Sequence, residues 1–388
     1  MGVRSGAMEA VVISAAFWRN RRVFVTGHTG FKGAWLTMAL QRLNARATGF
    51  ALSPPTDPSL FDLIGGDALI DDRRGDIADV SALSAAMASS EPEIVIHMAA
   101  QPLVSLGYDD PVETYRVNVM GTVALLEAVR HAPSVRAAVV VTTDKCYDNK
   151  EWHWGYRETD RLGGRDPYAN SKACAELATG AYRASFLGER GVCVVSARAG
   201  NVIGGGDFAD NRIVPDAARA LISKQELQVR NPGAVRPWQH VLEPLYGYLL
   251  LAEKAMTQQG VEGGYNFGPG REGERNVAEL LDSFNRALGR ESNWARSAAH
   301  YPHEANLLRL DTSRATTELG WNPLLDFEET LAWTAEWYGA YASGGDARRV
   351  AFDQVDAYLG QRVRMGAAES MTTADTIEDR THDRRRAV

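Results

Sequence analysis

The chain has 388 residues, of which 45% are apolar and 23% are charged, and its formal net charge is −7. This balance is typical of a globular protein with a buried core, whereas a nucleic-acid partner would require clustered Lys and Arg. No segment approaches the roughly 20 apolar residues that cross a bilayer, and the short apolar N-terminal stretch does not resemble a signal peptide. The three scattered cysteines form no CxxC pair. We therefore expect a cytoplasmic protein with reduced thiols and no metal site, nucleic-acid partner or membrane partner.

Residues 1–17 are expected to form a loosely held N-terminal arm, after which short β-branched runs alternate with helical patterns. The runs at 22–26, 47–51, 94–98, 137–142 and 192–197 predict strands, and the periodicity at 33–43, 80–88, 117–131 and 168–190 predicts helices. Strands that alternate with helices and are apolar on both faces indicate a parallel sheet covered on both sides. The fold class is therefore α/β, with a Rossmann-type doubly wound parallel sheet over residues 18–200.

Beyond residue 200 the pattern loosens, because glycines, prolines and polar clusters separate short elements. Residues 201–358 predict a smaller α/β substrate domain, interleaved with the first because some of its strands and helices can return to the sheet. Such a domain would lie over the carboxyl ends of the strands, where open α/β sheets bind ligands. The polar residues 359–388 are expected to form a disordered tail.

A glycine-rich loop joins the first strand to the first helix, with the sequence Gly27-His-Thr-Gly-Phe-Lys-Gly33. The three glycines permit a tight turn, close approach of the backbone to a pyrophosphate and close packing of helix against sheet. The unpaired N–H groups at the start of the helix then face the phosphates. Strand, loop and helix in this order predict a dinucleotide site.

The acidic residue that usually binds the adenosine ribose is absent, since Ser53 stands about 20 residues after the loop. A carboxylate there would repel the 2′-phosphate of NADP, so its absence leaves both NAD and NADP open as cofactors. Asp76 has two interpretations, either as a partner of the adenine amino group or as the cap of the helix that begins near residue 80.

Tyr168 and Lys172 are four residues apart and therefore lie on one face of the predicted helix. A phenol and an ammonium in this arrangement suit proton removal from a secondary alcohol, because the positive charge of Lys172 is expected to lower the pKa of Tyr168. Lys172 can also hold the ribose of a nicotinamide cofactor.

Together, the glycine loop and the Tyr-x-x-x-Lys motif resemble the extended branch of the short-chain dehydrogenase/reductase superfamily. The resemblance implies that Thr143 is the hydroxyl partner of Tyr168, and that His97 and Asn118 shape the site. The cofactor-binding residues that it implies come from the loop, the strand ends and the helix: Gly27, His28, Thr29, Gly30, Phe31, Lys32, Gly33, Ser53, Asp76, Ile77, Ala99, Ala100, Asn118, Thr142, Tyr168, Lys172 and Arg198.

The segment Thr142-Thr-Asp-Lys-Cys-Tyr147 is similar to sugar 4,6-dehydratases, in which an acid and a base, usually Asp and then Glu, follow this threonine. Lys145 replaces the glutamate, and in this respect the chain resembles the CDP-glucose branch. Longer matches agree, among them Tyr147-Asp-Asn-Lys-Glu-Trp152 and Val235-Arg-Pro-Trp-Gln-His-Val-Leu-Glu-Pro244. The resemblance covers about residues 17–358 and implies a substrate site formed by Gln101, Asn201, Arg212, Arg236, His240, Tyr265, Asn266 and Glu304.

What the resemblance implies is an internal redox cycle on a nucleotide-diphosphate hexose, with Thr143, Asp144, Lys145, Tyr168 and Lys172 as catalytic residues. Asp144 would be the acid and Lys145 the base at C5, which requires a neutral amine although the ordinary pKa of lysine is about 10.4. A lysine that only orients its neighbours is the alternative. Three rival functions stay open: a 4,6-dehydratase for another nucleotide, a nucleotide-sugar 4-epimerase and a non-catalytic NAD-binding regulator. The superfamily also implies a homodimer or homotetramer, paired through helices 117–131 and 168–190.

Overall fold

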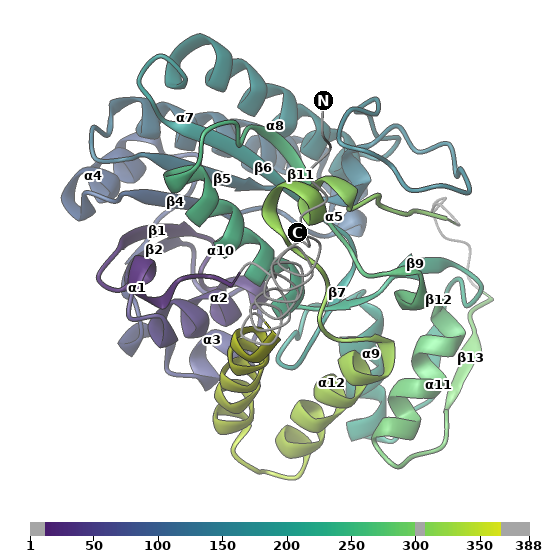
Figure 1. Ribbon diagram of the computed structural model, residues 1–388. Helices are drawn as coiled ribbons and strands as arrows, with labels where there is room; N and C mark the ends of the chain where they lie inside the picture. Colours follow the sequence, from purple (N-terminus) through teal and green to yellow (C-terminus); the bar gives the residue numbers. More distant parts are fainter. Residues whose placement is uncertain (1–11, 299–306, 366–388) are drawn as a thin grey trace, which may run out of the picture.

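The computed structural model describes residues 12–298 and 307–365. Seven parallel strands form the central sheet in the order β11-β6-β5-β4-β1-β2-β3 (Figure 1). The chain reverses its direction of winding between β1 and β4, which makes the sheet a doubly wound one with a crevice at that switch point. The strands are β1 Arg22–Thr26, β2 Arg46–Ala51, β3 Asp71–Arg74, β4 Ile94–His97, β5 Ala137–Val141, β6 Cys193–Ala199 and β11 Gly263–Phe267.

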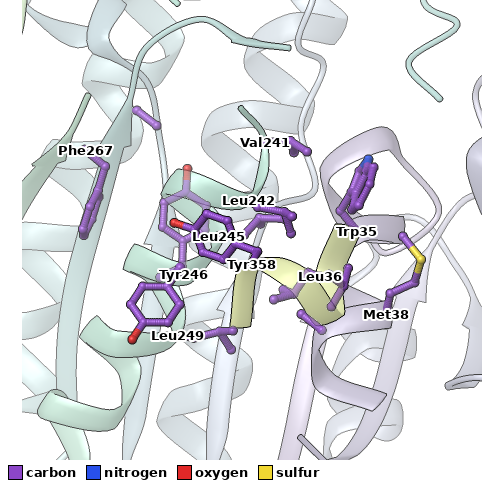
Figure 2. Close-up of a cluster of buried hydrophobic side chains, with 14 of the residues drawn as sticks. Trp35, Leu36, Met38, Val241, Leu242, Leu245, Tyr246, Leu249, Phe267 and Tyr358 are labelled. Carbon is purple, nitrogen blue, oxygen red and sulfur yellow. The ribbon is translucent and has the colours of Figure 1, made fainter. Parts of the chain in front are cut away.

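Helices cover both faces of this sheet, and each face has its own apolar core. One core joins the sheet to α2 and α10, and the other joins it to α4 and α7, with α8 beside α7. Figure 2 shows part of the first core, with Trp35 and Leu36 of α2 on one side and Leu245 and Leu249 of α10 on the other. These helices are α2 Phe31–Arg42, α4 Val80–Ser90, α7 Gly121–His131, α8 Pro167–Tyr182 and α10 Leu242–Thr257.

A smaller part of the molecule packs over the carboxyl ends of the strands and contains three two-stranded sheets (Figure 1). β7 pairs with β10, β8 with β13, and β9 with β12. Its elements are β7 Val202–Ile203, α9 Ile213–Ser223, β8 Leu227–Val229, β9 Val235–Pro237, β10 Gln239–His240, β12 Glu274–Asn276, α11 Val277–Ala287, β13 Trp294–Arg296 and α12 Phe327–Ala342. Because β11 and α10 belong to the central sheet and its cover, the two parts are interleaved.

Most of the remaining helices are short, and two of them are π-helical turns that fall within helices the sequence predicts as continuous. The predicted helix 117–131 begins with a π-helical turn, and the predicted helix 168–190 ends its regular part at Tyr182 before another π turn. Two strands of the central sheet were not predicted, namely β3, whose four residues are all charged, and β11. The remaining short elements are α1 Ala15–Trp18, α3 Leu60–Leu63, η1 Gly66–Ala68, α5 Val104–Asp109, α6 Pro111–Tyr115, η2 Arg116–Met120, η3 Asp144–Cys146, η4 Arg183–Leu187, η5 Arg271–Gly273 and η6 Ala315–Leu319.

Both predicted ends of the folded part require correction. Within the predicted arm, Ile13 is buried and its N–H donates to the hydroxyl of Tyr246, so the described residues 12–17 are docked on α10. At the other end, a helix runs over residues 347–365, beyond the predicted boundary at 358. Arg362 of this helix donates to the buried carboxylate of Glu243, which anchors it to α10. Burial of Ile13 at one end and of the Arg362–Glu243 pair at the other thus extends the folded part beyond both predicted bounds.

Candidate active site

A cavity of about 1520 Å³ opens at the carboxyl ends of the central strands, between the sheet and the smaller part. Its wall contains the loop after β1, the ends of β4, β5 and β6, the start of α8 and segments from residues 201–238. This is the position that the doubly wound topology favours for a ligand. Residues from both halves of the chain therefore line the same cavity.

The glycine loop fits against the backbone so closely that side chains are excluded at two positions. Gly27 has φ +75°, and a Cβ there would lie 2.7 Å from the backbone nitrogen of Ala99. A Cβ on Gly33 would lie 2.2 Å from the carbonyl oxygen of Gly27. Gly30 caps α2 without any side-chain hydrogen bond, so the first N–H groups of this helix remain available at the cavity wall. This end of α2 suits a pyrophosphate.

Most of the predicted cofactor residues line the cavity. From the loop and the strand ends these are Gly27, Thr29, Gly30, Phe31, Lys32, Gly33, Ser53, Asp76, Ile77, Ala99, Ala100 and Thr142. The side chain of Asp76 pairs with Arg116 at 2.9 Å, and the cap of α4 is Asp79, so the capping interpretation of Asp76 was wrong.

Three predicted cofactor residues have structural roles instead. The His28 ring is buried, with Nε2 2.8 Å from the carboxylate of Asp72. Asn118 accepts from the Gln101 N–H and donates to the Gln101 carbonyl, and so fixes the loop after β4. The guanidinium of Arg198, on β6, forms a buried ion pair with Glu176 of α8 at 2.8 Å. None of the three lines the cavity, because each satisfies a buried neighbour.

Tyr168 and Lys172 lie one turn apart on α8 and both line the cavity, although each is at least 92% buried. Asp166 begins this helix by accepting the N–H of Ala169, and Pro167 occupies the first helical position. The capped start of α8 thus fixes the direction in which both side chains leave the helix.

The pKa values in this pair differ from the prediction. Burial raises the pKa of Tyr168 to about 12, which a hydrogen bond with Thr143 and the charge of Arg212 oppose. Burial lowers the pKa of Lys172 to about 8, against the raising effect of Glu176. The prediction that Lys172 lowers the pKa of Tyr168 is not what the structure shows, because the cation that acts on the phenol is Arg212.

Thr143, Asp144 and Lys145 form a tight turn directly after β5. Thr143 caps the turn by accepting the Lys145 N–H, and its hydroxyl lies 3.0 Å from Oδ1 of Asp144. The Lys145 Nζ is 3.3 Å from the same Asp144 oxygen and 3.3 Å from Oδ1 of Asn201. Asp144 is fully buried, and its second oxygen has no hydrogen-bond partner among the residues that the structure describes. An acid and an amine therefore lie side by side, close to Tyr168.

The predicted substrate residues divide into two groups. Gln101, Asn201, Arg212 and Arg236 line the cavity, and Arg212 pairs with Asp207 at 2.8 Å. His240, Tyr265 and Asn266 do not line it, which corrects their assignment. The His240 ring lies against Trp35 and Trp333, Tyr265 donates to Glu318, and Asn266 accepts from Tyr147. Glu304 lies outside the described residues.

Two neighbours of the site were missed at the level of sequence. Glu176 lies one turn beyond Lys172 and accepts from Thr142 and Ser196, a role that its spacing along the same helix face could have indicated. Tyr248 of α10 accepts from the Lys32 amine at 3.3 Å, and no local pattern links these two residues. Burial, together with the charges of Arg212 and other nearby groups, lowers the pKa of Lys32 to about 7.

Over residues 12–298 and 307–365, no helix is long and apolar enough to span a membrane. In the same ranges, no cluster of three His, Cys, Asp or Glu side chains could hold a metal ion.

Comparison with known proteins agrees with this cavity chemistry. The model of the GDP-mannose 4,6 dehydratase family matches residues 24–334. The chain is 45% identical to the CDP-glucose 4,6-dehydratase of Salmonella typhimurium, over 91% of this chain and 100% of that protein. It is 31% identical to the dTDP-glucose 4,6-dehydratase of Streptomyces antibioticus, over 81% of this chain and 92% of that protein.

Solved structures of a 4,6-dehydratase and of a 4-epimerase both share this fold. A dTDP-glucose 4,6-dehydratase from Streptomyces venezuelae superposes with a TM-score of 0.73 and 23% identity, over 84% of this chain and 99% of that one. A UDP-glucose 4-epimerase from Thermotoga maritima superposes with a TM-score of 0.72 and 20% identity, over 81% and 98%. The fold alone therefore does not separate the two activities, but the family model and the closely matching sequences do. The chain belongs to the nucleotide-sugar 4,6-dehydratase family, within the extended short-chain dehydrogenase/reductase superfamily.

Proposed function

We propose that the protein is a CDP-glucose 4,6-dehydratase, which converts CDP-D-glucose to CDP-4-keto-6-deoxy-D-glucose and water with recycled NAD. The observation that carries the proposal is the Asp144–Lys145 pair beside Tyr168, in a chain 45% identical to the Salmonella typhimurium enzyme. A 4-epimerase needs no acid and base at this place, whereas removal of water across C5 and C6 requires both.

The cavity suits a dinucleotide with a nicotinamide ring. The residues that would hold it are the loop Gly27–Gly33, whose backbone leaves the first turn of α2 open, and Lys172 on α8. Bound there, NAD would supply the hydride acceptor for C4 of the sugar and the hydride donor for C6. Solved relatives that bind NAD include the dTDP-glucose 4,6-dehydratase of Streptomyces venezuelae, which supports NAD over NADP.

The chain supplies the proton transfers of this cycle. Tyr168 takes the proton of the C4 hydroxyl as the hydride leaves C4, and the resulting ketone acidifies the hydrogen on C5. The neutral amine of Lys145 takes that proton, and the electron pair of the C–H bond forms an enolate. The enolate expels the C6 hydroxyl, which leaves as water with a proton from Asp144. When the hydride returns to C6, the Lys145 ammonium gives its proton back to C5, which completes the 4-keto-6-deoxy sugar.

Two arginines of the cavity wall are candidate partners for the diphosphate of the substrate. Arg212 precedes α9 and Arg236 lies on β9, so the smaller part contributes both guanidinium groups. A guanidinium can donate two parallel hydrogen bonds to phosphate oxygens. We assign Gln101 to the sugar end of the cavity, since it lies on the loop after β4.

The proposed activity is tested with CDP-, dTDP-, UDP- and GDP-hexoses in separate incubations. We expect CDP-glucose to give a 4-keto-6-deoxy product at the highest kcat/KM. A C4 epimer without loss of water would establish the epimerase, and preference for another base would establish a different dehydratase. A non-catalytic regulator would give neither product, a possibility that the presence of both Tyr168 and Lys172 argues against.

We further propose that the enzyme forms a homodimer through α6, α8 and the π turns beside them. Large apolar side chains are exposed there, with Val112 78% and Leu177 62% accessible, and Met120 and Phe186 exposed as well. Large exposed apolar side chains on elements that contact one another are candidates for an interaction surface. Light scattering of the purified protein should give the mass of a dimer, and Leu177→Lys should give a monomer. Four chains would indicate a homotetramer with a second interface. The three unpaired cysteines support a cytoplasmic location.

A further inference from the structure

A buried carboxylate on α8 takes no part in the proton transfers described above. Glu176 lies one turn beyond Lys172 and two turns beyond Tyr168 on the same helix. Its side chain is 4% exposed and does not line the cavity. The carboxylate accepts four hydrogen bonds, and all the donors lie on β6 or directly after β5: Thr142 Oγ1, Ser196 Oγ, and Nε and Nη2 of Arg198.

The remaining packing of α8 gives little control over the rotation of the helix. Apart from Tyr168, its buried apolar side chains are those of Ala169, Ala173 and Ala175. Apolar contacts are non-directional, whereas two parallel bonds from a guanidinium to a carboxylate have a defined geometry. Arg198 makes such a pair of bonds through Nε and Nη2, at 2.9 Å and 2.8 Å. The carboxylate of α8 therefore sets the rotation of this helix against the sheet.

The same ion pair contacts both ends of the catalytic turn, which we define as residues 143–146. Thr142, one of the donors to Glu176, stands directly before this turn and is fixed to the sheet, because its N–H donates to a carbonyl of β6 at 2.9 Å. Directly after the turn, Nη1 of Arg198 donates to the hydroxyl of Tyr147 at 2.8 Å. One buried pair thus connects the helix that carries the phenol with the turn that carries the acid and the amine.

We propose that Glu176 is a positioning residue: through its ion pair with Arg198, it fixes the face of α8 that lines the cavity against the catalytic turn. The phenol of Tyr168 then keeps its hydrogen bond with Thr143 and its place beside the C4 hydroxyl of the bound sugar. This inference rests on the proposed function, in which Tyr168 takes the C4 proton. Glu176 acts through its neighbours, because its own side chain does not line the cavity.

The test measures the first-order rate constant for cofactor reduction in a single turnover, with CDP-glucose and NAD at saturating concentrations. Glu176→Gln keeps the size of the side chain and one carbonyl acceptor but removes the charge that pairs with Arg198. We expect the rate constant to fall about 10- to 100-fold, because a small displacement of the reacting groups costs rate on this scale. The dissociation constant for CDP-glucose should change by less than about threefold, since the arginines of the smaller part are not altered.

The pH profile of cofactor reduction is a second readout. Glu176 raises the pKa of Lys172 against the effect of burial. Without this carboxylate, Lys172 should lose its proton at lower pH, and the alkaline limb of the rate profile should move to lower pH. The other titratable groups that interact with Lys172 are unchanged in every variant: Lys32, His97 and Cys146. A merely structural role of Glu176 would not move this limb.

Glu243→Gln is the matched control. Glu243 on α10 is another buried carboxylate that pairs with an arginine, Arg362, at 3.0 Å, and it does not line the cavity either. Both substitutions leave an arginine without its carboxylate, so both should lower the midpoint of urea unfolding. A first-order rate constant does not depend on how much of the protein is folded. We therefore expect only Glu176→Gln to lower the rate constant and to move the pH profile.

Ser196→Ala is a milder variant, which decides the question where Glu176→Gln does not fold. It removes one of the hydrogen bonds to Glu176 and leaves the ion pair with Arg198 in place. We expect a fall of about 2- to 10-fold in the rate constant for cofactor reduction, smaller than the first because the other bonds remain.

Two results would overturn the proposal. One is an unchanged rate constant in Glu176→Gln or, where that variant does not fold, in Ser196→Ala. The other is a fall of the same size in Glu243→Gln, because the rate would then follow stability alone. Failure of the proposed function is distinguished by the wild-type protein, which would form no 4-keto-6-deoxy product from any of the nucleotide hexoses.

Discussion

The cofactor half and the substrate half of the cavity were predicted with different success, although the same resemblance supplied both. On the cofactor side, the structure places the loop Gly27–Gly33 at the cavity wall, apart from the side chain of His28. On the substrate side, His240, Tyr265 and Asn266 are buried among other side chains. The loop can contact a ligand through its backbone, and one strand and one helix set its position. The position of an isolated polar side chain instead depends on residues that are distant in the sequence. Motifs of local geometry are therefore transferred more safely than single side chains.

The largest effect is expected at Tyr168, where the two halves of the cavity meet. Tyr168→Phe removes the phenol that takes the C4 proton, and we expect kcat to fall by about 10²- to 10⁴-fold. The packing of α8 should be unchanged, because the ring remains. Reduced cofactor measured in a single turnover checks this, with the far-ultraviolet spectrum as control. A variant that reduces the cofactor near the wild-type rate would remove Tyr168 from the mechanism.

Arg236 tests the substrate side, since it lines the cavity and is 8% exposed. Arg236→Ala removes a guanidinium from the diphosphate, and the expected loss of substrate affinity is about 2–4 kcal/mol. Affinity for NAD should hardly change. Titration of CDP-glucose and of NAD by calorimetry separates the two, and loss of NAD affinity alone would assign Arg236 to the cofactor.

Asn266 was also predicted to bind the substrate, but we expect its substitution to affect stability rather than binding. Its amide accepts from Tyr147 and donates to the carbonyls of Tyr156 and Asp311, all within buried structure. Asn266→Ala leaves these groups unpaired, which should lower the free energy of unfolding by about 1–3 kcal/mol. The KM for CDP-glucose should stay the same. A raised KM without loss of stability would return Asn266 to the substrate site. The difference in predictive success between the loop and the single side chains would then be smaller.

The smallest effect is expected from the ionisation of Lys172, because burial lowers the pKa of its amine from the ordinary 10.5 to about 8. Between about pH 8 and pH 10.5, the unfolded chain binds more protons at Lys172 than the folded protein does. The contribution of Lys172 to the free energy of unfolding is therefore least favourable below pH 8 and improves as the pH rises through this window. Lys172→Met removes this dependence. Between pH 6 and pH 9 the wild type should gain about 1 kcal/mol relative to the variant in urea unfolding. Parallel curves for the two proteins would place Lys172 outside the buried site.

The sequence by itself determined the doubly wound sheet, the glycine loop and the order of Tyr168 and Lys172, since periodicity and short spacings express these features directly. It did not reveal β3, whose residues are all charged, because pairing with β2 at the edge of the sheet decides that strand. The tertiary structure alone placed Arg198 against Glu176 and Asn201 against Lys145. These partners are separated by 22 and 56 residues along the chain. Contacts over such distances depend on how the strands are ordered in the sheet, and no local pattern contains that information.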